Sequence, residues 1–340
     1  MAGRKKLSDL AHHLGISEAT VSLALNGREG VSPVTKKKVL QAAKELGYTP
    51  NYFARGLATR KSGIIGLIVP EIENPFYSRL TQAMDQAVRR TGHHLIIEFS
   101  NFDLESERQA IKRFLQLSAE GIVISPIHCY ATSEEYRQLA LQKDVPIMYI
   151  GAHYDFDSHY VMTDLSMGSE QLTTHLLSQG IRDIVFLTGP RDILLASTRE
   201  AGFEKAYAQF GIEVSENRYV RCNKFNYEEA YRLTTELLKG KTLPQAIITV
   251  NDIMALGVMR AIRQLGYRIP DDIRIAGYDN VIYSEIAEVS LTTVYQPVDV
   301  LVETTVKHLL QLIDEPNSES WIQLKVEPEL IIRESTQRRE

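Results

Sequence analysis

The sequence predicts a small all-α N-terminal domain of the helix-turn-helix type, followed by an α/β core of two doubly wound lobes. Residues 1–60 contain apolar stripes at helical spacing and no clear strand. From Ile64 onward, short β-rich runs alternate with amphipathic segments, which is typical of parallel sheets with right-handed crossovers. We expect more than ten strands in about 275 residues, which is too many for one compact sheet, so the core is predicted to have two lobes.

Three helices are expected before residue 50. The first ends at Gly15, and Ser17 is the expected N-cap of the second. Ser32 is the expected N-cap of the third, with Pro33 at its first position and Gly47 just after its end. A helix, a turn that contains glycine and a second short helix together make the helix-turn-helix pattern.

The core is expected to alternate between strands and helices. The predicted strands cover residues 64–69, 95–99, 121–125, 146–150, 184–188, 246–250 and 273–277. The predicted helices between them include residues 76–91, 106–117, 168–179, 198–210 and 253–265.

The predicted organisation has three parts. They are a helix-turn-helix domain at 1–50, a hinge helix and linker at 51–62, and a two-lobed core at 63–340. Within the core, the first lobe is expected to cover about 63–163 and 295–322, and the second about 164–294 and 323–340.

Charge is distributed unevenly along the chain. Residues 1–61 contain 11 Lys and Arg against 4 Asp and Glu, whereas the remainder contains 27 against 39. A basic head on an acidic body predicts that the head meets a polyanion such as double-stranded DNA. A solvated charged surface is the alternative that charge alone leaves open.

Composition argues against several other classes of protein. The hydrophobic content of 44% and the charged content of 24% are ordinary for a soluble globular chain. No window approaches the roughly 20 apolar residues that span a bilayer. The basic N-terminus has no apolar segment of a secretory signal, so we expect a cytoplasmic protein that does not contact membranes. Cys129 and Cys222 lie outside any Cys-x-x-Cys pattern, so neither a disulfide framework nor a metal site is expected.

Nothing in the sequence supports catalysis. The chain contains no G-x-G-x-x-G after a strand, no G-x-x-x-x-G-K-[ST], no G-x-S-x-G and no H-E-x-x-H. We therefore predict no enzymatic activity, no catalytic residues and no cofactor. The basic head and the missing secretory signal argue against a transport-type binding protein. A nucleoid protein without sequence preference would instead show weak, steeply salt-dependent binding to DNA.

The second predicted helix is the expected recognition helix, which would enter the major groove with its first turns against base edges. Leu23 and Ala19 would project outward together, which suits contact with thymine methyl groups. Glu18 can accept a hydrogen bond from a cytosine amino group. The small hydroxyl side chains of Thr20 and Ser22 suit phosphate contacts.

A series of motifs runs along the whole chain in order. They include Thr20-Val21-Ser22, Gly47-Tyr48-Thr49-Pro50-Asn51, Asn74-Pro75-Phe76-Tyr77, Ala276-Gly277-Tyr278-Asp279-Asn280 and Thr292-Thr293-Val294-Tyr295-Gln296-Pro297. At this spacing they resemble the LacI/GalR family of bacterial repressors. The resemblance implies a helix-turn-helix head joined to a core like the type I periplasmic sugar-binding proteins.

The resemblance also implies a hinge helix that orders on DNA. In the family its leucine wedges into the minor groove, and Leu57 matches that residue. An ordinary core leucine is the alternative explanation. The residues expected at the DNA are Ser17, Glu18, Ala19, Thr20, Ser22, Leu23, Asn26, Arg55 and Leu57. Lys6 stands where the family often has a capping threonine, and Leu23 stands where relatives often have Arg or His.

For the core, the resemblance implies an effector cleft between the lobes. The residues expected there are Asn74, Phe76, Tyr77, His128, Arg199, Phe225, Asn251 and Asp279. Aromatic faces suit the C–H face of a sugar ring, while amide, guanidinium and carboxylate groups suit its hydroxyls. His128 stands where ribose-type binders often have an aspartate. The apolar loop 191–195 argues against a purine and favours a sugar or glycoside with an apolar portion.

Several of these residues have a plain structural alternative. Asn251 can cap the helix that follows it, and could do so while facing the cleft. Asp279 can be a turn residue, and Arg199 can form a salt bridge on the surface of its helix. Phe76 and Phe225 can belong to the hydrophobic core.

The expected function is sequence-specific regulation of transcription, most simply repression of sugar-uptake or sugar-catabolism genes. A homodimer is expected to present two heads to a pseudo-palindromic operator. A small sugar-like effector is expected to change operator affinity allosterically. The alternative is a regulator that responds to a nucleoside, a sugar phosphate or a corepressor protein.

Overall fold

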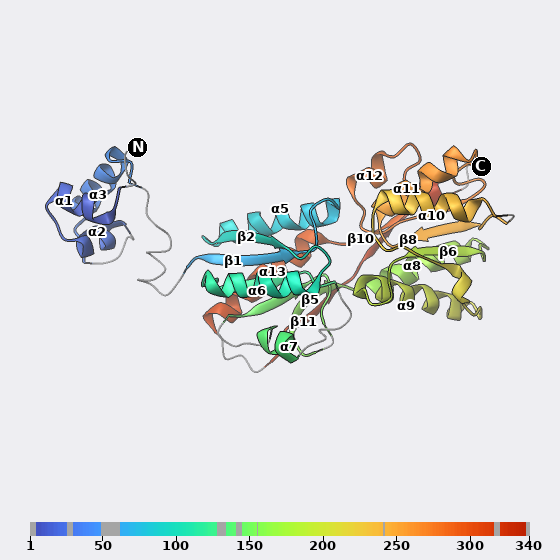
Figure 1. Ribbon diagram of the computed structural model, residues 1–340, viewed down its shortest axis with the longest axis horizontal. Helices are drawn as coiled ribbons and strands as arrows, with labels where there is room; N and C mark the ends of the chain where they lie inside the picture. The colour runs from blue at the N-terminus through green and yellow to red at the C-terminus, as the bar shows by residue number, and fades with distance from the viewer. Residues whose placement is uncertain are drawn as a thin grey trace. The chain divides into compact units, whose positions relative to one another are not determined.

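The chain divides into two compact units, Met1–Ser62 and Gly63–Glu340 (Figure 1). The computed structural model describes residues 5–25, 30–48, 62–127, 134–140, 145–154, 156–240, 242–315 and 320–337. No helix among these residues has an apolar stretch long enough to cross a membrane.

The first unit contains three short helices. They are α1 (Leu7–Leu14), α2 (Glu18–Leu25) and α3 (Pro33–Glu45). A single small core joins them, because Leu10 of α1, Val21 and Ala24 of α2 and Val39 of α3 are buried against one another. Because Val21 points into this core, the face of α2 that points away from the core is in contact with solvent.

Side chains at the helix ends define these three helices. The Ser17 hydroxyl accepts a hydrogen bond from the Thr20 amide at 3.2 Å, and the Ser32 hydroxyl accepts one from the Thr35 amide at 3.1 Å. At the start of α1, Lys6 supplies no side-chain cap. The Asp9 carboxylate instead accepts a hydrogen bond from the Lys6 amide at 2.8 Å, so an acidic residue in the first turn satisfies a free amide there.

The first lobe of the second unit is a six-stranded parallel sheet in the order β11-β5-β4-β3-β1-β2. Its strands are β1 (Ile64–Val69), β2 (His94–Phe99), β3 (Gly121–Ile124), β4 (Ile147–Ile150), β5 (His159–Thr163) and β11 (Gln323–Val326). Its helices are α5 (Pro75–Arg90), α6 (Leu104–Gln116), α7 (Glu134–Ala140) and α13 (Val298–Asp314). Leu67 of β1 packs with α5 and α13, whereas Ile68 packs with α6, so helices cover both faces of the sheet.

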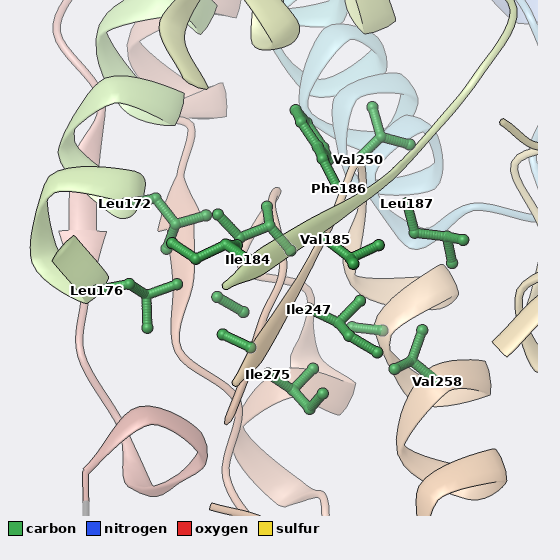
Figure 2. Close-up of a cluster of buried hydrophobic side chains, with 14 of the residues drawn as sticks. Leu172, Leu176, Ile184, Val185, Phe186, Leu187, Ile247, Val250, Val258 and Ile275 are labelled. Atoms are coloured by element: carbon green, nitrogen blue, oxygen red, sulfur yellow. The ribbon is translucent and has the colours of Figure 1, made fainter. Parts of the chain in front are cut away.

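The second lobe is a four-stranded parallel sheet in the order β7-β6-β8-β9. Its elements are α8 (Leu165–Ser178), β6 (Ile184–Thr188), α9 (Leu194–Gln209), η1 (Glu216–Arg218), β7 (Tyr219–Arg221), α10 (Tyr227–Leu238), β8 (Ala246–Thr249), α11 (Asp252–Gln264), β9 (Arg274–Ala276) and α12 (Ile282–Ile286). Figure 2 shows Leu172 and Leu176 of α8 on one side of the buried strands and Val258 of α11 on the other.

The chain passes between the lobes after β5, after β10 (Thr293–Tyr295) and after β11. β10 pairs antiparallel with β12 (Glu329–Ile331), and η2 (Glu334–Thr336) follows. Tyr278 and Thr293 of β10 are both buried, and the Tyr278 hydroxyl donates to the Leu165 carbonyl at the start of α8 at 3.2 Å. Three crossings allow the lobes to tilt about one short region while each sheet remains intact.

Each of the seven predicted strands is present, with bounds that differ by at most one residue at either end. The prediction that residues 323–326 belong to the second lobe is wrong, because β11 pairs in parallel with β5 of the first lobe. The sequence of β11 is Gln-Leu-Lys-Val at an exposed edge, so it has none of the continuous apolar character that revealed the central strands.

Gly202 allows α8 and α9 to pack closely. A Cβ atom at this position would lie 2.1 Å from the Ser166 carbonyl oxygen, which belongs to the backbone of α8. We expect Gly202→Ala to lower the free energy of unfolding by about 2–3 kcal/mol, although the same change in an exposed helix raises it by about 1 kcal/mol. Urea unfolding followed by circular dichroism measures the difference.

The exposed neighbour Ala201 provides the control for this experiment. Ala201→Gly should cost only about 1 kcal/mol through helix propensity. A Gly202→Ala variant as stable as the parent chain would show that α8 and α9 can separate without cost.

Candidate functional site

Seven of the eight residues predicted for the effector line a single pocket in the two-lobed unit. They are Asn74, Phe76, Tyr77, Arg199, Phe225, Asn251 and Asp279. The eighth, His128, lies outside the described residues. Several of the seven follow the carboxyl ends of strands from both sheets, where loop residues of parallel sheets face a ligand.

Arg199 and Asp279 form an ion pair inside the pocket wall. The guanidinium Nη2 donates to the Asp279 carboxylate at 3.1 Å, and both residues are at least 93% buried. The second terminal nitrogen donates to the Val250 carbonyl, and the guanidinium carbon lies 3.7 Å from the centroid of the Tyr278 ring. The surface-salt-bridge explanation for Arg199 is therefore wrong.

The Asp279 carboxylate is shared by three partners. Besides Arg199, the Gln296 amide nitrogen donates to it at 2.8 Å, and the Asn74 side chain also hydrogen-bonds to it. Burial raises the pKa of Asp279, while the Arg199 charge and these hydrogen bonds act in the opposite direction. The four residues come from both lobes and from the crossing between them.

The backbone of Asp279 also serves as a turn. Its φ is 104°, which L-residues rarely adopt, and Asn280 follows with a φ of 50°. The Asp279 amide donates to the Val294 carbonyl at 2.8 Å, which ties the turn to β10. Asp279 is thus both a turn residue and part of the pocket wall, and its strained backbone is held by the crossing segment.

The two pocket asparagines both cap helices. The Asn251 side-chain oxygen accepts from the Met254 amide at 2.8 Å, and the Asn74 oxygen accepts from the Phe76 amide at 3.0 Å. Capping fixes the position of each side chain, and the remaining NH2 groups stay available for other contacts. The Asn251 nitrogen donates to the Phe225 carbonyl at 3.3 Å, which holds that aromatic residue beside the pocket.

Aromatic rings line the pocket on both sides. Phe76 and Tyr77 meet edge to face at 5.2 Å between centroids, and both are buried in the first-lobe core. Phe102 of the first lobe and Phe225 of the second lie 6.0 Å apart. Phe76 therefore belongs to the hydrophobic core and also lines the pocket. The pocket wall has apolar faces from both lobes.

A direct contact joins the lobes beside these rings. The Leu194 amide donates to the Ile127 carbonyl at 2.7 Å, and Ile127 and Ile193 are buried together with Ala196. Leu195, in the first turn of α9, lines the pocket. The apolar residues Ile193, Leu195 and Ala196 at the start of α9 thus pack against the first lobe beside the pocket.

Sequence reasoning missed several lining residues. Glu71 follows β1, Phe102 follows β2, and Gln296 follows β10. The carboxyl-end rule that selected Asn251 and Asp279 also applies to Glu71 and Phe102 and would have found them, whereas Gln296 follows a strand that is paired antiparallel. Burial, with a smaller contribution from Glu73, raises the pKa of the Glu71 carboxyl to about 7.

The predicted DNA residues on α2 lie on its solvent face where the structure describes them. Ser17, Glu18 and Ala19 are exposed, and Thr20, Ser22 and Leu23 are partly exposed. Ser17 is engaged as the helix cap, and its hydroxyl lies 2.8 Å from the Thr20 hydroxyl. Asn26, Arg55 and Leu57 lie outside the described residues.

No group of three His, Cys, Asp or Glu side chains in the described part of the chain is placed to hold a metal ion.

Two family models match the chain, one within each of its two units. Residues 6–51 match "Bacterial regulatory proteins, lacI family", and residues 173–336 match a periplasmic binding protein-like domain. The ribose operon repressor of Halalkalibacterium halodurans is 30% identical over 330 residues, which cover 97% of this chain and 96% of that protein. The chain belongs to the LacI family. The family resemblance and the predicted fold class are therefore confirmed.

Other relatives of this LacI-family chain support the same assignment. The PurR repressor of Pasteurella multocida is 30% identical over 98% of this chain and 99% of that protein. A solved lac repressor dimer bound to operator and the anti-inducer ONPF is 26% identical, with a TM-score of 0.87 over 99% of this chain and all of that one. The CelR–cellobiose complex is 27% identical, with a TM-score of 0.73 over 98% of this chain and all of that one.

The ion pair in the pocket wall makes a testable contribution to stability. We expect Arg199→Met to lower the free energy of unfolding by about 3–5 kcal/mol, because it leaves the Asp279 carboxylate buried without its cation. Adding Asp279→Asn should restore at least about 1 kcal/mol, because the uncompensated charge is then absent. Urea unfolding of both singles and the double variant measures the coupling.

Arg191→Met is the matched control, since Arg191 pairs with Glu216 on the surface, where both side chains are more than 60% exposed. It should cost no more than about 1 kcal/mol. Equal losses for the two arginine variants would contradict a special role for burial.

Proposed function

We propose that this LacI-family chain is a repressor that binds an operator through α2 and changes its operator affinity when a sugar or glycoside occupies the pocket. The observation that carries the proposal is the convergence on one pocket, lined by both lobes, of seven residues that the family resemblance implied. A ligand that touches both lobes favours one arrangement of the lobes over others, which is the requirement for allosteric control.

The chemistry of the lining suits a hydroxyl-rich ligand. Phe76 and Phe225 offer apolar faces for the C–H surface of a sugar ring. Arg199 keeps a buried Nε without a hydrogen-bond partner among the described residues, and the Asn251 amide adds another donor. The CelR relative was solved with cellobiose, which supports a sugar in a pocket of this fold.

The solvent face of α2 supports a direct reading of DNA. Ala19 and the partly exposed Leu23 place small and apolar groups where thymine methyl groups lie in the major groove. The basic head supplies the sequence-independent attraction to phosphates. We propose a homodimer on a pseudo-palindromic operator, as in the lac repressor dimer bound to its operator. The wedge role of Leu57 remains part of this proposal, as do a cytoplasmic location beside the DNA and the absence of catalysis.

Effector binding is tested first by thermal shift against neutral monosaccharides, glycosides, sugar phosphates and nucleosides. A ligand at 100 times its Kd should add about 2.7 kcal/mol to folded stability. Asp279→Asn and Tyr77→Phe should each reduce the shift, because both residues line the pocket. Asp299→Asn, an exposed carboxylate paired with Arg79, should leave it unchanged. Shifts only with nucleosides or phosphates would contradict the sugar proposal.

Operator recognition is tested by a charge placed on the exposed face of α2. Ala19→Glu should weaken binding to the selected operator at least about 100-fold, because a carboxylate would face base edges and phosphates. Fluorescence anisotropy with a labelled duplex measures the affinity. Gln41→Glu, an equal charge change on the exposed face of α3, should have a much smaller effect. Comparable losses for both variants would indicate general electrostatic repulsion rather than contact through α2.

A further inference from the structure

Glu71 occupies a fixed place at the pocket. It lies in the loop directly after β1, and its side chain lines the pocket together with Asn74 and Tyr77. The loop is held on both sides of Glu71: the Asn101 amide donates to the Pro70 carbonyl at 2.9 Å, and the Ser78 hydroxyl donates to the Ile72 carbonyl at 2.6 Å. The backbone on both sides of Glu71 is therefore anchored beside the pocket. The Glu71 carboxylate lies close enough to the pocket residue Tyr77 to contribute to the raised pKa of that phenol.

The Glu71 carboxylate is half-buried and has no ion pair or hydrogen bond with any described residue. A half-buried carboxylate without partners loses hydration and gains nothing from the protein in return. Burial and the nearby Glu73 accordingly raise its pKa to about 7. Such a group is satisfied when a ligand brings hydrogen-bond donors to it.

The balance of charge in the pocket is negative. Among the described lining residues, those that can carry charge near neutral pH are Glu71, Asp279 and Arg199. Both terminal nitrogens of the Arg199 guanidinium already donate, to Asp279 and to the Val250 carbonyl, and the Asp279 carboxylate compensates its charge. The pocket as described thus offers a ligand one free carboxylate and no free cation.

We propose that Glu71 is a specificity residue that selects effectors by charge: it accepts hydrogen bonds from the hydroxyls of a neutral sugar and excludes sugars that carry a carboxylate or phosphate. This inference rests on the proposed function, because it assigns the ligand class of the same pocket. It decides between neutral sugars and sugar phosphates as effectors, a choice that the sequence motifs left open.

The test compares neutral sugars with uronates of the same ring. Thermal shift and calorimetric titration at pH 8 would use glucose against glucuronate and galactose against galacturonate, each free and as the methyl β-glycoside. The parent chain should bind each uronate at least tenfold more weakly than its neutral partner. Glu71→Gln should reduce the ratio of the uronate Kd to the neutral-sugar Kd about tenfold, because repulsion between two carboxylates is removed.

Glu73→Gln is the matched control, because it removes an equal charge from the same loop at an exposed residue outside the pocket lining. The ratio of the uronate Kd to the neutral-sugar Kd should be close to that of the parent chain in Glu73→Gln. If Glu73→Gln changes this Kd ratio as much as Glu71→Gln does, the assignment to Glu71 is overturned.

A second arm varies pH between 6 and 8. The uronates stay ionised there, because sugar carboxylic acids titrate at about pH 4 or below. Among the described residues, the titratable and charged groups that share the loop or the pocket with Glu71 are Glu73 on its own loop, Tyr77 of α5, and Asp279 with Arg199 from the second lobe. As pH falls, Glu71 becomes neutral. The ratio of the uronate Kd to the neutral-sugar Kd should therefore decrease in the parent chain but not in Glu71→Gln. A ratio that still changes with pH in Glu71→Gln would assign the titration to a group other than Glu71 and overturn the inference.

The remaining outcomes separate this inference from the proposed function. Neutral sugars and uronates that bind equally well to the parent chain would overturn charge selection and leave the sugar proposal intact. No binding of any panel member to the parent chain or to either variant would overturn the sugar proposal and this inference together.

Discussion

The carboxylate of Asp279 is the point on which the organisation of the pocket depends. Arg199 reaches it from a helix of the second lobe, Asn74 from the start of α5 in the first lobe, and Gln296 from the segment that crosses between them. A change in the tilt of the lobes cannot preserve all three hydrogen bonds with equal geometry. The state of the pocket and the arrangement of the lobes are therefore linked through one buried charge.

That link has an energetic cost that the rest of the structure offsets. The carboxylate is desolvated, and its residue has a φ of 104°. Arg199 compensates the charge, and the Asp279 backbone is held by β10 through the Val294 carbonyl. Strain and burial concentrated at one residue are typical of sites selected for function rather than for stability alone. A ligand hydroxyl at this site would compete with hydrogen bonds that already exist, so small differences in ligand geometry would matter.

Much of this arrangement follows from the sequence. Caps such as Ser17 and Ser32 and the buried central strands follow from local rules, because hydroxyl capping and continuous apolar runs leave clear patterns. Arg199 and Asp279 were predicted through family resemblance, since 80 residues separate them and no local pattern pairs them.

Other features could not be predicted because they depend on tertiary contacts. β11 has the composition of an exposed segment, and only its pairing with β5 makes it a strand. The contact between the Leu194 amide and the Ile127 carbonyl uses backbone atoms, so no side-chain pattern announces it. Glu71 differs from these: its position after β1 could have been selected by the carboxyl-end rule, but its lack of a partner depends on the pocket around it.

A pocket with this charge balance constrains how an effector acts on the chain. A neutral ligand adds no charge to the core, so it cannot act on the basic head through long-range electrostatics, which salt also screens within about 8–10 Å. Its influence must come from differential contact with two arrangements of the lobes, through Asp279 and the rings that face each other across the pocket. Shape and hydrogen bonding in the pocket would then control the response, and the Leu194–Ile127 hydrogen bond is one contact between the lobes that a change in their arrangement must keep or break.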